Sequence, residues 1–209
     1  MKNDIFRIED GTLLGLNKNI RCPKNIIIPD SVTIIRDYAF SDCCLKNVII
    51  PDTVTSIGDH AFSGCWSLKN VIIPDTVTSI GDYAFSDCIS LKNVTIPNNV
   101  TNIGSGAFNG CDNLKNVTIP NNVTSIEPCV FAHCISLESI IIPQSITSIG
   151  DYAFWRCTSL KSINIPNGVT RIGKHAFEDC ESLESINIPN TVTSIGEYAF
   201  PNGAKIIRR

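Results

Sequence analysis

The sequence predicts a solenoid of the α/β class, dominated by strands, in which each repeat forms one coil. Three observations support this fold class. A strand-like segment closed by a proline recurs at a spacing of 22 residues once and 23 residues six times. A phenylalanine recurs in register with that segment, and so does a cysteine. A fixed period in the twenties is typical of solenoids, whose coils bury each other's faces. The repeating prolines are Pro29, Pro51, Pro74, Pro97, Pro120, Pro143, Pro166 and Pro189.

The first element of each repeat is a predicted strand, represented by residues 68–73 (LKNVII). Its alternation places Leu68, Val71 and Ile73 inside the coil. Successive strands should pair in parallel into one sheet of eight strands, about 35 Å across. The proline that follows has no N–H to donate, so it ends the strand. The residues expected to face solvent are Lys69, Asn70 and Ile72.

The second element is the recurring segment 54–58 (VTSIG), with Val54 and Ile57 facing inward. It is either a short second strand or an extended arc on the opposite wall of the coil. Gly58 is expected at a tight corner with a positive φ. Asp59 then stands where the N-cap of a helix would be, so we expect a single helical or 3-10 turn before the chain returns to the next strand.

Two internal columns follow from stacking equivalent positions. One is a spine of phenylalanines: Phe40, Phe62, Phe85, Phe108, Phe131, Phe154, Phe177 and Phe200. The other is a ladder of cysteines: Cys43, Cys65, Cys88, Cys111, Cys134, Cys157 and Cys180. Equivalent side chains in parallel coils point in the same direction, which is poor geometry for a disulfide. We therefore expect buried free thiols, with disulfides or a redox function as the alternative.

The predicted organisation has three parts. Residues 1–28 form an N-terminal cap, with a β-hairpin turn at Asp10-Gly11, and the first strand. Residues 29–200 contain eight tandem repeats, and residues 201–209 form a shortened last strand that acts as a C-terminal cap. The charges of Arg208 and Arg209 should protect an exposed sheet edge.

Composition and motifs exclude several functions. The net charge of −3 does not suggest a nucleic-acid binder, and no apolar run is long enough to span a membrane. Residues 1–7 contain no apolar signal-peptide region, which favours a cytoplasmic protein if Met1 is the native start. Cys129, His133 and Cys134 do not have the number and spacing of zinc ligands. The sequence identifies no matched nucleophile or carboxylate partner for either His60 or His175. We therefore expect no enzymatic activity, no metal and no cofactor.

The outward columns of the predicted sheet are the candidate partner-binding site. Exposed isoleucines in adjacent strands would form an apolar strip, and such strips commonly mark a partner or oligomer site. The alternative is that β-branched residues simply stabilise parallel strands. A lysine column beside the strip would complement an acidic partner or provide solubility. The residues assigned to this site are Ile27, Ile49, Ile72, Lys69, Asn70, Lys92 and Thr95, with Trp66 and Ile89 at the rim.

The repeat pattern IPxxVTxIGxxAFxxCxxLxxVxIP, as in Pro74 to Pro97, resembles the BspA-like class of leucine-rich repeats. This class is known from bacterial surface antigens and adhesins and from expanded families in some protists. The resemblance implies a right-handed coil with a curved parallel sheet on its concave face. It also implies binding to host or matrix proteins, or cell contact, at a cell-surface or secreted location. The fifth repeat departs from the pattern at Glu127-Pro128-Cys129-Val130.

Two functional hypotheses follow. The first is a protein-binding or adhesion module that presents this sheet to a protein or glycoprotein. The second is a structural, self-assembling repeat protein in which the Ile/Trp strip or the coil ends join copies. The chain would then be a monomer or a weak homo-oligomer.

Overall fold

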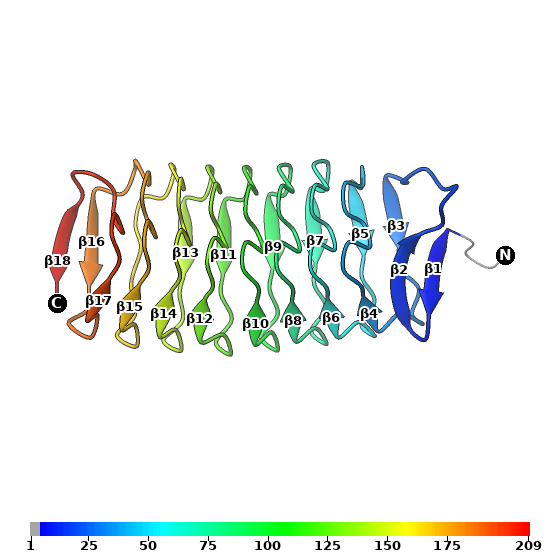
Figure 1. The fold of residues 1–209 in the computed structure, drawn as a ribbon, viewed down its shortest axis with the longest axis horizontal. Coiled ribbons are helices and arrows are strands. Elements are labelled where there is room, and N and C mark those ends of the chain that lie inside the picture. The colour runs from blue at the N-terminus through cyan, green and yellow to red at the C-terminus, as the bar shows by residue number, and fades with distance from the viewer. Residues whose placement is uncertain (1–4) are drawn as a thin grey trace.

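The computed structural model describes residues 5–209 as a stack of coils that follow one another along a single axis (Figure 1). From β3 to β14, each coil contributes a three-residue strand to one wall and a two-residue strand to the other. Within the described residues the secondary structure consists of strands and turns, without a helix. The predicted β-dominated solenoid is therefore confirmed.

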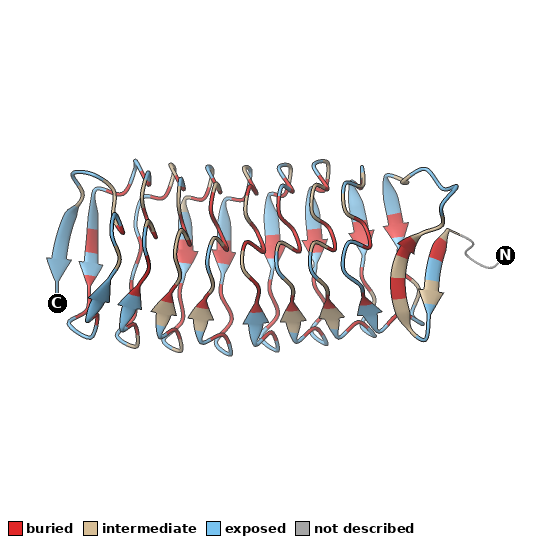
Figure 2. Ribbon diagram, viewed as in Figure 1, coloured by how far each residue is buried: buried red, intermediate tan, exposed pale blue. Residues whose placement is uncertain are grey.

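The main sheet contains six parallel strands that pair in register. In each of them a buried central residue lies between two exposed ones, as the strand colours in Figure 2 show. Leu68, Val71 and Ile73 are buried as predicted. The strands are β3 (Asn25–Ile27), β5 (Asn47–Ile49), β7 (Asn70–Ile72), β9 (Asn93–Thr95), β11 (Asn116–Thr118) and β13 (Ser139–Ile141).

The prediction of eight strands in one sheet was wrong. The sheet ends at β13, and on this wall the next coil has no strand and pairs with the coil after it through a bridge between Asn164 and Asn187. Beyond it, β16 (Ser185–Ile188) pairs with β18 (Lys205–Arg208) in a separate two-stranded sheet. The outward residue at the end of the strand is isoleucine or threonine in the six paired strands, and the equivalent residue is asparagine in the two coils that follow. Asparagine is depleted in strands, which fits the missing strand at Asn164, but Asn187 still pairs with Ile207 between β16 and β18.

The second wall consists of short strands. Of the two predicted alternatives, a short strand and an extended arc, the short strand is therefore correct. They form two parallel sheets, one of which begins with the N-terminal hairpin. The first holds β4 (Ile34–Ile35), β6 (Ser56–Ile57), β8 (Ser79–Ile80) and β10 (Asn102–Ile103). The second holds β12 (Ser125–Ile126), β14 (Ser148–Ile149), β15 (Arg171–Ile172) and β17 (Ser194–Ile195).

The glycine that follows six of the eight short strands permits close packing of the coils and does not adopt a positive φ, contrary to our expectation for Gly58. A Cβ added at Gly58 would lie 2.6 Å from the backbone N of Asp37 and 2.8 Å from the carbonyl C of Arg36. A Cβ at Gly81 would meet the preceding coil at 2.6 Å in the same way. Any side chain at this position would force two coils apart.

The next segment is also not the helical turn that we expected. Every second N–H there donates to the following coil, as in His60 N to Asp82 O (2.8 Å) and Phe62 N to Ala84 O (2.7 Å). The intervening N–H groups close turns within the coil, as in Ser63 N to His60 O (3.1 Å). His60 has a φ of 53°, in the left-handed region, which is incompatible with a helix.

Asp59 likewise links coils and does not cap a helix. Its Oδ1 accepts a hydrogen bond from the backbone N of Asp82 (2.8 Å), and its own backbone N donates to Asp37 Oδ1 (2.9 Å). Asp82 Oδ1 continues the ladder by accepting from Ser105 N (2.7 Å). A carboxylate that accepts from a backbone N–H forms a strong, charge-assisted hydrogen bond.

The second wall is interrupted between β10 and β12, a junction that we call the seam. At the seam Glu127 occupies the position that is glycine in neighbouring coils, so its side chain prevents close approach of the coils. Pro128 has no N–H to donate, and Ser105 in the coil before has no carboxylate to accept. The sequence departure noticed in the fifth repeat is therefore the cause of the split.

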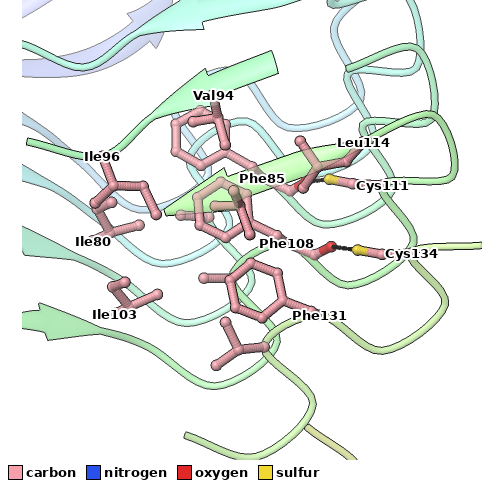
Figure 3. Close-up of a cluster of buried hydrophobic side chains, with 14 of the residues drawn as sticks. Ile80, Phe85, Val94, Ile96, Ile103, Phe108, Cys111, Leu114, Phe131 and Cys134 are labelled. Atoms are coloured by element: carbon pink, nitrogen blue, oxygen red, sulfur yellow. Dashed lines mark hydrogen bonds between the residues drawn. The ribbon is translucent and has the colours of Figure 1, made fainter. Parts of the chain in front are cut away.

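The interior contains the predicted phenylalanine spine (Figure 3). Phe85, Phe108 and Phe131 are fully buried, with centroids 5.5 and 5.7 Å apart and rings within 6° of parallel. The stack runs from Phe40 to Phe200, where the last ring is half-buried and 6.1 Å from Phe177. The spine continues across the seam, so the core is one hydrophobic cluster along the array.

The cysteine column is confirmed for six positions, and all ten cysteines are free thiols in the structure. Each buried thiol donates to the carbonyl of a phenylalanine in the spine, as in Cys111 Sγ to Phe85 O (3.3 Å) and Cys134 Sγ to Phe108 O (3.2 Å). Burial raises the pKa of both thiols far above the ordinary range. Cys43 differs, because it is only half-buried in the coil that lacks one residue.

Both ends are capped by strands. The hairpin of β1 (Phe6–Glu9) and β2 (Thr12–Leu16) turns at Asp10-Gly11, as predicted, and β2 pairs with β4 on the second wall. At the other end Arg209 Nη2 donates to Asn164 Oδ1 (2.6 Å), and Arg208 Nη1 donates to Val192 O (3.3 Å). The terminal arginines therefore bind back onto the array.

Candidate binding surface

The exposed isoleucine strip lies on the outer face of the main sheet, where the sequence placed it. Ile27, Ile49 and Ile72 are directly paired across β3, β5 and β7. Their side chains are 66%, 57% and 77% exposed. Strands in a sheet lie about 4.8 Å apart, so the three side chains form one contiguous apolar strip.

The strip ends at β9, where Thr95 pairs with Ile72. Beyond it lies a hollow of about 150 Å³ between β9 and β11. The neighbouring strands share only the pair Asn93 and Asn116 in this part of the sheet. The apolar strip is therefore bordered by a shallow depression on its C-terminal side.

One edge of the strip is lined by a column of exposed lysines that continues over five coils. The backbones of consecutive lysines are hydrogen-bonded, as in Lys92 N to Lys69 O (3.0 Å). Within residues 5–209 none of these five lysines forms an ion pair. In the C-terminal half, by contrast, Lys161 Nζ is paired with Glu138 (2.9 Å). The five are Lys24, Lys46, Lys69, Lys92 and Lys115.

An asparagine column runs between the lysines and the isoleucines. Asn47 Nδ2 donates to Asn25 Oδ1 (2.6 Å), and Ser139 Oγ donates to Asn116 Oδ1 (2.8 Å) further along. Asn70 belongs to this column and is exposed. These side chains can supply both donors and acceptors to a bound polypeptide.

Sequence reasoning missed the opposite edge of the strip. Three exposed aspartates, Asp30, Asp52 and Asp75, follow the prolines of the first three coils. The same position is asparagine or glutamine in every later full coil. The aspartate column can be recognised in the sequence from its spacing. Each aspartate is three residues after an exposed isoleucine, and each isoleucine is three residues after a lysine.

The predicted rim residues lie at the turns before the strands. Trp66 is 52% exposed ahead of β7, and Ile89 is exposed ahead of β9. Each precedes the lysine of its coil by three residues, so they are exposed apolar groups on the lysine side of the strip. We call the lysine, asparagine, isoleucine and aspartate columns of the first three coils the interaction face.

The turn segment carries a second feature, two stacks of aromatic rings in which histidine and tyrosine share one column of the repeat. His60 lies between Tyr38 and Tyr83, with centroids 4.8 and 5.1 Å away. His175 lies between Tyr152 and Tyr198 in the same manner, and its Nδ1 is 2.8 Å from Glu178 Oε2. These rings occupy the left-handed position of each coil and stack because the coils repeat at a fixed spacing.

The remaining side chains show no convergent chemistry. Among residues 5–209 no three His, Cys, Asp or Glu side chains are grouped so as to hold a metal ion. That part of the chain also has no helix long and apolar enough to cross a membrane. Two cavities of about 360 and 670 Å³ lie near the C-terminal end, away from the interaction face. Their walls include Glu178, Glu181 and Glu184 in the first, and Gln144, Asn167 and Arg209 in the second.

Comparison with solved structures gives close relatives of the fold. A leucine-rich repeat protein from Bacteroides ovatus is 37% identical over 88% of this chain, with a TM-score of 0.73. This chain spans 55% of that protein. A leucine-rich cell surface protein from Faecalibacterium prausnitzii is 31% identical over 95% of this chain and 72% of its own length, with a TM-score of 0.66. A leucine-rich repeat protein from Eubacterium ventriosum is 34% identical over 75% of this chain and 43% of its own, with a TM-score of 0.68.

Comparison with curated proteins found no match. The family model for the BspA-type leucine-rich repeat region, which spans six copies, matches residues 18–137 and again residues 78–207. Together the two matches cover the array from the loop before β3 to the last strand. The chain belongs to the BspA-type leucine-rich repeat family.

Proposed function

We propose that the protein is a non-enzymatic binding module whose interaction face contacts a protein or glycoprotein partner. The observation that carries the proposal is the register of Ile27, Ile49 and Ile72, each more than half exposed on adjacent strands. Burying apolar side chains of this size contributes about 1.5–3 kcal/mol each. The unpaired lysine column beside them favours acidic groups on the partner.

The surrounding structure explains why this surface is free to act in binding. The coils are held together by buried columns and by hydrogen bonds between their backbones, and neither uses the side chains of the outward isoleucines. The outward residue at the end of a strand needs only to be β-branched to favour the sheet, as Thr95 and Thr118 show. Isoleucine at three adjacent positions therefore exceeds what stability requires.

Photo-crosslinking tests this proposal even while the identity of the partner is unknown. A benzophenone amino acid at position 72 is compared with the same group at position 141, because Ile141 is 65% exposed at the equivalent position of β13. After irradiation with serum and matrix protein extracts, we expect protein adducts from position 72 and few from position 141. Equal labelling at both positions, or none at either, would refute the proposal.

A second pair of variants separates binding from folding. Ile49→Lys should abolish adduct formation from position 72, because it places a charge in the centre of the strip. Ile141→Lys is the matched control and should leave the adducts unchanged. Both side chains are exposed, so the melting temperature of either variant should change by less than about 2 °C.

A further inference from the structure

The interaction face has a symmetry that no other part of the array shares. In each of the first three coils an exposed lysine lies three residues before the exposed isoleucine, and an exposed aspartate lies three residues after it. The charge pattern is therefore centred on the isoleucine. The three sets are Lys24, Ile27 and Asp30; Lys46, Ile49 and Asp52; and Lys69, Ile72 and Asp75.

We propose that this face pairs with the same face of a second copy of the chain, about a two-fold axis parallel to the solenoid axis. The inference rests on the proposed function, because it names the partner of the same surface. Rotation about that axis reverses the strand direction but keeps the order of the coils. Each isoleucine then meets its own equivalent, and each lysine meets the aspartate of the equivalent coil.

The charges decide between this axis and the other face-to-face arrangement. A two-fold axis parallel to the strands would place lysine opposite lysine and aspartate opposite aspartate, which is repulsive. Only the axis along the solenoid gives six lysine–aspartate pairs around three isoleucine pairs. Two-fold symmetric pairing of this kind is the commonest arrangement in homo-oligomers.

The same groups cannot neutralise each other within one copy. Lys46 and Asp52 are six residues apart at opposite ends of one strand, a span of about 20 Å in extended chain. Within residues 5–209 neither column forms an ion pair. A second copy brings the complementary charges together at the spacing of the strands, because both ladders repeat once per coil.

The later coils set the limit of the contact. The aspartate position becomes Asn98 and Asn121 in the next two coils, and the isoleucine position becomes Thr95 and Thr118. A stable interface buries about 800 Å² on each partner. Three coils provide less than this, so we expect a dimer that dissociates at low protein concentration and weakens with salt.

The test is the monomer–dimer equilibrium, measured by sedimentation velocity on the purified chain from about 1 to 500 μM. The same measurement is made on variants in which one charge is exchanged. In Lys46→Glu the introduced carboxylate faces Asp52 of the second copy, and in Asp52→Lys two ammonium groups face each other. Because symmetry uses each pair twice, either variant should raise the dimer Kd about tenfold or more. Lys115→Glu is the matched control and should not change the Kd, because its position faces the equivalent of Asn121.

Mixing the two variants gives the decisive measurement. Lys46→Glu and Asp52→Lys are each repelled by themselves but complement each other, so an equimolar mixture should form heterodimers at concentrations where each alone is monomeric. The double variant should also dimerise. A chain that is monomeric throughout, or a dimer that is indifferent to the charge exchange, would overturn the inference. If photo-crosslinking from position 72 still captures another protein in that case, the proposed function stands and only the self-pairing fails.

Discussion

Truncation of the central phenylalanine of the spine tests how the array is held together. Phe108 is fully buried and stacks on Phe85 and Phe131 on either side. Its backbone carbonyl also accepts a hydrogen bond from the thiol of Cys134. The variant Phe108→Ala removes the ring from both coil interfaces while leaving the backbone hydrogen bonds in place.

The magnitude follows from the burial and the two ring contacts. Truncation of a buried phenylalanine to alanine costs about 3–5 kcal/mol, which includes the cavity that remains. Each aromatic contact contributes about 0.5–1.5 kcal/mol beyond the buried area. Phe108 has two such contacts, so we expect a loss in the upper part of the range, about 4–5 kcal/mol. Phe200→Ala is the matched control, because this half-buried ring has one ring neighbour at 6.1 Å, and it should cost only about 1 kcal/mol.

Urea denaturation followed by tryptophan fluorescence measures this loss. Trp66 lies on the N-terminal side of Phe108 and Trp155 on the C-terminal side. Single-tryptophan backgrounds made with Trp66→Phe or Trp155→Phe therefore report on each half of the array separately. The midpoint of Phe108→Ala should fall by about 1–2 M urea in both backgrounds. A cost below about 1 kcal/mol, or a cost equal to that of Phe200→Ala, would refute a continuous spine.

Three further changes probe the packing between coils. Gly81→Ala should destabilise the protein by about 2–3 kcal/mol, because the added methyl group meets the backbone of the preceding coil. Gly64→Asn is the control and should cost less than about 1 kcal/mol, because other coils carry non-glycine residues at that left-handed position. Equal denaturation midpoints for the two variants would contradict this. The triple variant Ser105→Asp, Glu127→Gly and Pro128→Asp should restore the carboxylate ladder across the seam and raise the free energy of unfolding by about 1–3 kcal/mol. A lower melting temperature would argue against our explanation of the seam. Burial raises the pKa of five thiols of the cysteine column, those of Cys65, Cys88, Cys111, Cys134 and Cys157, so above a pH of about 8.5 the unfolded state loses thiol protons that the folded state retains. Stability should therefore be insensitive to these thiols below that pH and fall above it, by up to about 1.4 kcal/mol per pH unit for each buried thiol; a flat urea midpoint from pH 8 to 10 would contradict the burial.

The strands and the internal columns could be predicted because the repeat displays them eight times. Val71 and Ile73 alternate with outward residues in a pattern that only a strand satisfies. The phenylalanine and cysteine columns followed from stacking equivalent positions. These properties depend on one coil and its period, and both are visible in the sequence.

The errors arose where the conformation depends on the distance between coils. The role of Gly58 and the hydrogen bonds of His60 are set by the neighbouring coil, which one repeat does not show. A signal for the left-handed positions was present, because Gly106 and Gly110 occupy in one coil the sites that Tyr83 and Asp87 occupy in the preceding one. Glycine among larger residues at an equivalent position indicates a positive φ.

For the binding surface, the isoleucine strip and the lysine column could be identified from the sequence, but the aspartate column was overlooked. In a single repeat, Asp52 is only the residue that follows Pro51. Its relation to Ile49 and Lys46 becomes meaningful when three coils are placed side by side with their exposed residues on one face. The symmetry of the face is therefore a property of the assembled array.

The most direct test of the binding surface is an NMR spectrum of the isoleucine δ1-methyl groups, recorded at increasing chain concentration and on addition of a crosslinked partner once it is identified. Our account predicts that the methyl signals of Ile27, Ile49 and Ile72 shift together. The signal of Ile141, which is equally exposed on β13, should stay in place. Movement of the Ile141 signal alone, or no change at the three strip positions when a partner is bound, would contradict the account.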